Sequence, residues 1–215
     1  MDIYDIKNLP ILEESVKKQA SNGEYDFEGN KSLLKLYSCY PDSLNIDILL
    51  MALILSMMRL PYTDYLAMSC LVPRKLKNDD KFKYLSSCVT LLEGGAFEEF
   101  WTKYNSNKPF FNSINNFEKA IRSFVMSNVR STYSIIDKPK LQSLLGLNSN
   151  DIDNYLKSSS DVNMSDSTDT SIAMQKSSTR QQLNANYEDY LQASDVFGLL
   201  REVKSAELAS KIAQF

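Results

Sequence analysis

The fold of this 215-residue chain is decided by its most apolar segment, LNIDILLMALILSMMR at residues 44–59. A helix built from this segment is apolar on nearly every side, so it must pack against neighbours on more than one side. The continuous apolar run, residues 48–58, has only about half of the roughly 20 residues that a membrane-spanning helix needs. We therefore expect a helix at the centre of the core, with Leu53 buried and with Asp42 and Ser43 capping its first turn.

Further helices are predicted on both sides of this segment, because apolar residues recur at helical spacing between Pro, Gly and capping residues. Asp26 and Asp79 stand where carboxylates cap free N–H groups, which favours a structural role over a catalytic or metal-binding one. Together the helices predict a mainly α fold that begins with a helical-repeat (HEAT/TPR-like) domain over residues 1–130. The additional helices are expected at approximately residues 10–21, 26–40, 63–72, 79–92, 97–104 and 115–133.

The pattern changes at residue 131. A short β-prone run at 133–136 precedes two predicted helices, 139–145 and 151–156, and Gly146-Leu147-Asn148 separates them. Strand, helix, turn, helix is the opening of a winged-helix module.

The polar stretch 158–182 is rich in Ser, Thr, Asp, Asn and Gln and contains one strand-like island at 171–174. We interpret it as a wing with a long loop, so that the winged-helix module covers residues 131–182. The alternative is a plain linker without a wing.

A C-terminal helix is predicted over residues 183–215. A terminal helix this apolar, following a complete domain, needs something to cover it. Either the chain's own domain or partner helices in a complex could do so, and the second possibility makes this stripe the candidate partner-helix interface. The stripe consists of Val196, Leu199, Leu200, Val203, Leu208 and Ile212.

Histidine is absent from the chain, which is 43% hydrophobic and carries a net charge of -3. Its absence excludes Ser/His/Asp and Cys/His catalysis and every zinc site that needs imidazole. The chain has no glycine-rich phosphate loop either, so we expect no enzymatic activity, no cofactor and no metal; a small enzyme with carboxylate or thiolate chemistry is the disfavoured alternative. Cys39, Cys70 and Cys88 form no CxxC pair and are interpreted as reduced core thiols. With no targeting signal, we expect a cytoplasmic protein without membrane contact.

The distribution of charge in the predicted winged-helix module and terminal helix disfavours nucleic-acid binding. Residues 126–215 hold nine Lys and Arg against eleven Asp and Glu, and the would-be recognition helix begins Asn150-Asp151-Ile152-Asp153. These carboxylates would repel phosphates, so we expect no direct DNA binding and favour edge-to-edge pairing with other winged helices. One basic cluster is interpreted as a solvated helix entry rather than an RNA contact, because Asp79 and Asp80 interrupt it. This cluster consists of Arg74, Lys75, Lys77, Lys81 and Lys83.

Several short motifs follow one another in a recognisable order. They are YDFEGN (25–30) with LLKLY (33–37), LPYTDY (60–65), FW (100–101), FE (117–118) with RSF (122–124), and LQSLLG (141–146). In this order the chain resembles the subunit k family of eukaryotic translation initiation factor 3 over residues 10–157. The resemblance implies the PCI architecture, a helical-repeat domain followed by a winged helix, which subunits of the proteasome lid and the COP9 signalosome share.

The resemblance also implies a function. A member of this family would be a non-catalytic scaffold subunit of translation initiation factor 3 that supports initiation on the 40S ribosomal subunit. Its partners would be other subunits of the factor, especially subunit l, and it would contact the 40S subunit indirectly. The alternative is a homologous PCI subunit of the proteasome lid or the COP9 signalosome. The similarity fades beyond Leu156, where the family carries tryptophans, whereas Trp101 is the only tryptophan of this chain.

Overall fold

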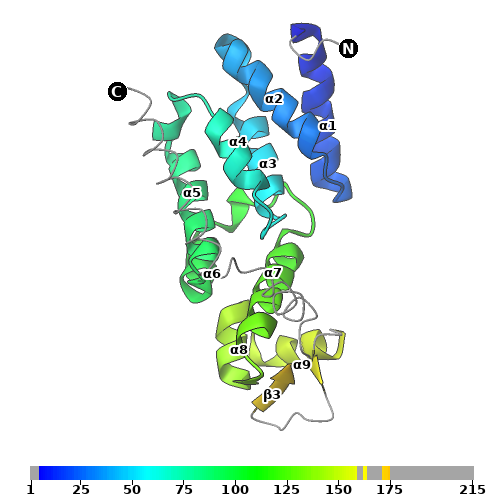
Figure 1. Cartoon of the computed structure of the whole chain (residues 1–215), viewed down its shortest axis with the longest axis vertical. Helices are drawn as coiled ribbons and strands as arrows, with labels where there is room; N and C mark the ends of the chain where they lie inside the picture. Colours follow the sequence, from blue (N-terminus) through cyan, green and yellow to red (C-terminus); the bar gives the residue numbers. More distant parts are fainter. Residues whose placement is uncertain (1–4, 159–161, 164–170, 175–215) are drawn as a thin grey trace, which may run out of the picture. The chain divides into compact units, whose positions relative to one another are not determined.

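The computed structural model describes residues 5–158, 162–163 and 171–174, and this part of the chain is mainly helical (Figure 1). The helices are α1 (Leu9–Asn22), α2 (Phe27–Cys39), α3 (Ile46–Met57), α4 (Asp64–Leu71), α5 (Asp80–Glu93), α6 (Phe97–Ser106), α7 (Phe117–Thr132), α8 (Lys138–Leu145) and α9 (Ser149–Ser158). The strands are β1 (Ile135–Asp137), β2 (Val162–Asn163) and β3 (Ser171–Met174). The helix expected over residues 183–215 lies outside the described residues.

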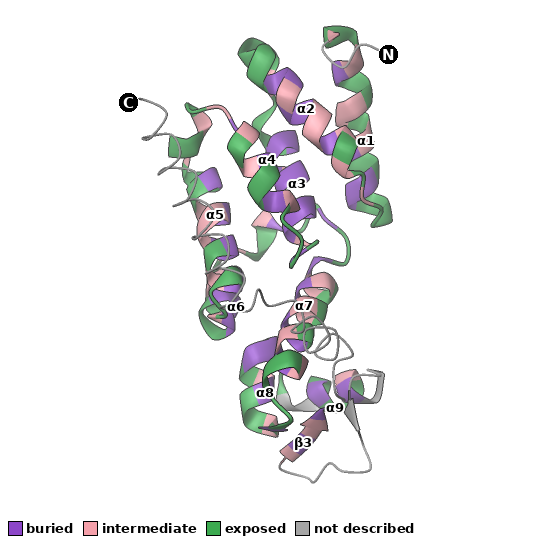
Figure 2. Cartoon of the chain, viewed as in Figure 1, coloured by how far each residue is buried: buried purple, intermediate pink, exposed green. Residues whose placement is uncertain are grey.

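Helix α3 lies at the centre of the helical part, as its sequence predicts. It contacts α1, α2, α4 and α5, and nine of its twelve residues are buried (Figure 2). The side chain of Leu53 is 0% exposed, which confirms the prediction for this residue. A helix that is apolar on nearly every side is thus covered over most of its surface, as the hydrophobic effect requires, and Ile46 and Asp47 in its first turn are exposed.

The cap of α3 differs from the expected one. The side chain of Asn45 accepts hydrogen bonds from two N–H groups of the first turn, at 3.1 and 3.4 Å. Asp42 and Ser43 lie in a 3-10 turn, Pro41–Ser43, which ends before α3 begins, so their predicted capping role is wrong. The expected caps at Asp26 and Asp79 are confirmed, since the Asp26 carboxylate accepts a hydrogen bond from one N–H group of the following turn and the Asp79 carboxylate accepts two.

Consecutive helices pack against each other from α1 to α4, α5 packs against α3 and α6, and α8 packs against both α6 and α7. The three strands form one antiparallel sheet in the order β1-β3-β2, with Ile136 opposite Ile172. One face of this sheet is apolar and belongs to the same hydrophobic core as the helices. The sheet contributes the buried residues Ile136, Ile172 and Met174. The helices around it contribute Leu141 and Leu145 of α8 and Ile152 and Leu156 of α9.

The three cysteines do not share one environment. Cys88 of α5 is buried, and burial raises the pKa of its thiol to about 11. Cys39 and Cys70 are exposed, at or near the ends of α2 and α4. The interpretation as core thiols is therefore wrong for these two, because each occupies a position in the last turn of its helix that faces solvent.

Candidate functional site

The side chain of Trp101 links α6 to α8. Trp101 is buried, and its Nε1–H donates a hydrogen bond of 2.9 Å to the backbone carbonyl of Leu144. Gly146 ends α8 in the left-handed conformation, with φ +60°, and a Cβ atom added there would lie 2.6 Å from the Trp101 ring. The indole therefore packs directly on the backbone at the end of α8, where only glycine leaves room.

Arg122 of α7 reaches the same helix end. Its Nε–H donates to the carbonyl of Leu145 at 3.3 Å, and its guanidinium lies 5.2 Å from the centre of the Trp101 ring. Another guanidinium nitrogen pairs with Glu118 at 2.7 Å, and Glu118 in turn accepts a hydrogen bond of 2.9 Å from the hydroxyl of Tyr104. Partial burial opposes ionisation of Glu118, but the hydrogen bonds from Tyr104 and Arg122 prevail and lower its pKa.

A third contact fixes the outer side of α8. Glu98 of α6 pairs with Lys140 at 2.7 Å and accepts a hydrogen bond of 2.7 Å from the hydroxyl of Ser143. These contacts lower the pKa of Glu98, the hydrogen bond from Lys140 most of all. This pair is exposed, so water and salt screen it and it contributes little to stability.

We call the contacts of Trp101, Glu118, Arg122 and Gly146 the α8 joint. Three of the motif segments quoted above, 100–101, 117–124 and 141–146, meet there, although up to 45 residues separate them. The joint holds α8 by two backbone carbonyls and one glycine, and α8 leads out of strand β1. Because α8 packs against β1, the joint connects the sheet to α6 and α7 through α8.

The sheet presents an edge that no described strand covers. Among the described residues, β1 pairs only with β3 and lies at the border of the sheet. Ile135 in this strand is 65% exposed, and Tyr133, two residues before it, is also exposed. An edge strand with unpaired backbone groups and an exposed apolar side chain is suited to pairing with a strand of another chain.

Other residues singled out in the sequence are placed as follows. The basic cluster at residues 74–83 is exposed; Lys81 pairs with Asp47 at 3.0 Å, and Asp79 serves as a helix cap. The six residues of the candidate partner-helix interface, 196–212, lie outside the described residues. Within the described ranges, no group of three or more Cys, Asp and Glu residues could hold a metal ion, and no helix is long and apolar enough to cross a membrane.

Sequence reasoning missed the joint as a site. The sequence places Trp101, Arg122 and Gly146 in three separate motifs, and nothing in the local pattern indicates that they contact one another. The only signal was the combination of a single tryptophan with a glycine at the end of an apolar helix. The sequence predicts Ile135 only as part of a β-prone run, because its exposure depends on which strand lies at the border of the sheet.

The geometry defines a class of protein: a helical body that carries a small antiparallel sheet whose border strand β1 is uncovered by any described strand. A family model described as the CSN8/PSMD8/EIF3K family matches residues 43–181, well over half of the chain. This chain belongs to the CSN8/PSMD8/EIF3K family.

Proteins named "Eukaryotic translation initiation factor 3 subunit K" are similar to it. The one from Aedes aegypti is 35% identical over 143 residues, which cover 66% of this chain and 65% of the relative. The one from Drosophila virilis is 34% identical over 155 residues, which cover 72% of this chain and 70% of the relative. The match therefore spans just under two thirds of the mosquito protein.

Proposed function

We propose that this chain is a non-catalytic scaffold subunit of eukaryotic translation initiation factor 3, which supports initiation on the 40S ribosomal subunit in the cytoplasm. Its family and the names of its relatives support membership of that complex. The scaffold role rests on one observation: the α8 joint fixes a sheet with an open edge onto a helical body. Contact with the 40S subunit would be indirect, through other subunits.

The proposal includes the PCI architecture, with a helical-repeat domain over residues 1–130, a winged-helix module over 131–182 and a terminal helix over 183–215. The element order β1-α8-α9-β2-β3 with antiparallel pairing supports the winged helix. The packing of consecutive helices from α1 to α4, and of α5 against α3 and α6, supports the helical repeat.

A protein partner fits this module better than DNA does. Asp151 and Asp153 are exposed on α9, the helix that would have to enter a DNA groove. Lys138, a nearby cation, is already paired with Asp153 at 2.6 Å. Carboxylates on this helix would face the phosphate backbone and repel it.

Two surfaces would carry the assembly. The first is the β1 edge, which would pair with a strand of a neighbouring subunit. The second is the terminal stripe at residues 196–212, which helices of subunit l would cover. Each large apolar side chain buried there would contribute about 1.5 to 3 kcal/mol, part of which is offset by the entropy of ordering the helix.

Affinity purification of the tagged chain from its own cells, followed by mass spectrometry, tests which complex it joins. We expect subunits of initiation factor 3 and 40S ribosomal proteins. Enrichment of proteasome lid or COP9 signalosome subunits instead would overturn the assignment and favour the other branches of the family.

The β1 edge is tested by Ile135→Lys in the same purification. We expect fewer initiation factor subunits to co-purify, because a charged side chain on an edge strand opposes strand pairing. Ile11→Lys in α1 is the matched control, since Ile11 is 61% exposed and Ile135 65%. Equal recovery of subunits with both variants would exclude the edge as an interface.

The terminal stripe is tested by the double variant Leu199→Ser and Leu200→Ser. If subunit l covers the stripe, the variant loses subunit l while the melting temperature of the isolated chain is unchanged. If assembly is normal and only the melting temperature falls, the stripe belongs to the chain's own core and the partner assignment fails.

A further inference from the structure

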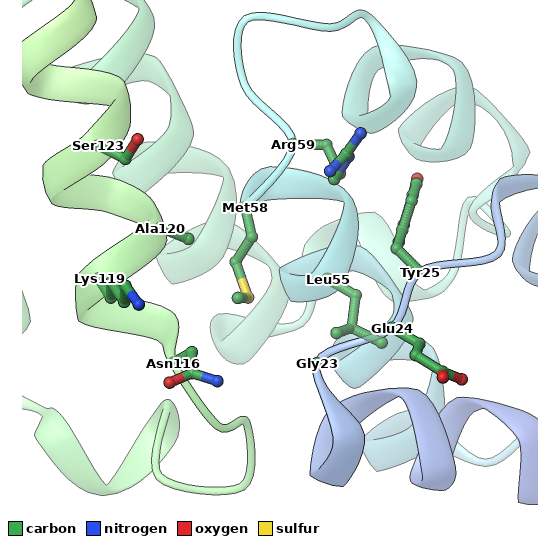
Figure 3. A pocket seen from close by; sticks show the side chains of 10 residues that line it. All are labelled: Gly23, Glu24, Tyr25, Leu55, Met58, Arg59, Asn116, Lys119, Ala120 and Ser123. Atoms are coloured by element: carbon green, nitrogen blue, oxygen red, sulfur yellow. The ribbon is translucent and has the colours of Figure 1, made fainter.

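A pocket of 320 Å³ lies between the α1–α2 loop, the end of α3 and the first half of α7 (Figure 3). Neither the α8 joint nor the β1 edge contributes to it. The loop supplies Gly23, Glu24 and Tyr25, α3 and its end supply Leu55, Met58 and Arg59, and α7 with its N-cap supplies Asn116, Lys119, Ala120 and Ser123.

The walls of this pocket are tied to one another. Asn115, which precedes α7, donates two hydrogen bonds to the end of α1: its backbone N–H to the carbonyl of Ala20 at 3.0 Å and its side-chain amide to the carbonyl of Ser21 at 2.7 Å. The side-chain amides of Gln19 and Asn30 bond reciprocally at 3.0 and 2.9 Å and hold α1 against α2. The pocket is therefore formed before any ligand arrives, which lowers the entropic cost of binding.

The floor of the pocket is apolar. Leu55 and Ala120 supply fixed aliphatic surface, and Met58 points into the space between α3 and α7 (Figure 3). A methionine has three rotatable bonds and a polarisable sulfur, so it adapts to side chains of different shape. Such a floor suits one large aliphatic or aromatic side chain.

Arg59 stands on one wall in a fixed position. Its guanidinium lies 5.6 Å from the ring centre of Tyr25 and 5.5 Å from that of Tyr62, so two aromatic rings orient it. Burial raises the pKa of Tyr25, and the neighbouring carboxylate of Asp64 raises it further, so the phenol stays neutral beside the cation.

The residues that line the pocket carry a net positive charge, with Arg59 and Lys119 against Glu24, while the carboxylate of Asp64 lies near Tyr25 and does not line the pocket. Lys119 lies on α7, across the pocket from Arg59, and neither cation forms an ion pair with a described carboxylate. Glu24 is the only acidic residue among those that line the pocket, and its carboxylate points away from α7 (Figure 3). In a chain with a net charge of -3, this is a local attraction for anions.

We propose that this pocket binds an acidic peptide segment of a partner protein. One large apolar side chain of the segment would lie on the floor of Leu55 and Met58, and flanking carboxylates would pair with Arg59 and Lys119. A peptide fits better than RNA because single-stranded RNA is bound by free aromatic faces and a continuous groove of cations. Here Arg59 lies over the rings of Tyr25 and Tyr62, and the lining residues hold only two cations.

A fluorescence anisotropy titration of the full chain tests the proposal. The probe is a labelled 12-residue peptide with four glutamates around a single leucine. We expect saturable binding that becomes roughly tenfold weaker when the leucine is replaced by serine and is lost when the glutamates are replaced by lysines. No binding of the acidic leucine peptide, or equal binding of all three peptides, would overturn the proposal.

Variants of the chain localise the binding. Lys119→Glu should weaken binding of the acidic leucine peptide roughly tenfold, because it reverses the charge of one of the two cations that line the pocket. Lys77→Glu makes the same change in net charge at an exposed residue outside the pocket and should leave binding unchanged. Equal effects of both variants would mean that only the overall charge matters.

A titration with a labelled 12-nucleotide uridine RNA tests whether the pocket binds RNA instead of an acidic peptide. We expect the RNA to bind more weakly than the acidic peptide and without dependence on Lys119. If the RNA binds more tightly than the peptide and Lys119→Glu abolishes RNA binding, the ligand of the pocket is a nucleic acid and the peptide proposal fails. None of these measurements depends on the complex that the chain joins, so the pocket and the proposed function can fail separately.

Discussion

The centre of the helical part and the α8 joint are held together by different forces. Around α3, nearly every contact is apolar, and stability is spread over many side chains that each exclude water. At the joint, a few oriented contacts hold the helices together. The Trp101 indole N–H and the Arg122 guanidinium donate hydrogen bonds to backbone carbonyls, and the Trp101 ring packs on Gly146. Damage to the first region should unfold the protein, whereas damage to the second should loosen the attachment of α8, and with it the sheet, to α6 and α7.

The largest effect is expected from Leu53→Asp in the first region. Leu53 is fully buried, and an unpaired carboxylate there should lower the free energy of unfolding by about 4 kcal/mol or more. Leu66→Asp in α4 is the control, because Leu66 is 60% exposed and its replacement should cost less than about 1 kcal/mol. Urea denaturation followed by circular dichroism measures both, and comparable losses would show that α3 is not the centre of the core.

Gly146→Ala, at the α8 joint, should have the next largest effect on stability. Its Cβ would collide with the Trp101 ring, and its backbone would be strained at φ +60°, so we expect a loss of about 2 to 3 kcal/mol. Gly95→Ala isolates the backbone strain, because Gly95 has φ +73° with nothing within 4 Å of an added Cβ, and should cost about 1 kcal/mol. The fluorescence of Trp101, the only tryptophan, should change in the Gly146 variant alone; equal losses in both variants would mean that the ring contact is immaterial.

Glu118→Gln should have a smaller effect that depends on pH. The pKa of Glu118 is lowered in the folded protein, so its carboxylate contributes stability above its unfolded pKa near 4.5, and this contribution is lost as the pH falls through the folded value. We expect a loss of about 1 kcal/mol at pH 7, since water partly screens the pair with Arg122, and a difference that shrinks towards pH 3. Glu99→Gln, on the exposed side of α6, should show neither effect; a pH-independent loss at Glu118 would exclude the ion pair as its cause.

The smallest effect is on reactivity rather than stability. Cys39 and Cys70 should react with a thiol reagent at pH 8 within seconds, whereas Cys88 should react only when the helical core opens, because it is buried and its pKa is about 11. A core variant such as Leu53→Ala should therefore accelerate the reaction of Cys88, while Glu118→Gln at the joint should not. Fast reaction of all three thiols in the native protein would contradict the assigned burial of Cys88.

The core around α3 could be predicted from the sequence, whereas the α8 joint could not. The α3 helix and the burial of Leu53 could be predicted because a continuous apolar run needs no knowledge of its neighbours. The sequence predicts Asp42 and Ser43 as the cap of α3, whereas Asn45 provides it. All three residue types are good caps, and the short turn at Pro41–Ser43 leaves Asn45 next to the helix. The same holds for Cys39, whose exposure depends on which side of the last turn of α2 meets solvent.

The joint could not be predicted, because the side chains of Trp101 and Arg122 find acceptors far along the chain. Hydrogen bonds to the carbonyls of Leu144 and Leu145 leave no trace in local composition, since every residue has a carbonyl. Gly146 was recognised as a helix end, but its second role, as the place where the indole rests, depends on tertiary packing. The candidate interface at residues 196–212 stays a prediction.

The use of backbone carbonyls at the joint has a consequence for how this surface can change during evolution. A carbonyl acceptor survives any substitution that keeps α8 helical, so the outer residues of this helix can be exchanged for others without releasing Trp101 or Arg122. The constraint is concentrated on one side of the contact: the donors on α6 and α7 and the single glycine must stay. Related chains could thus acquire different partner-facing residues on α8 while keeping the same attachment.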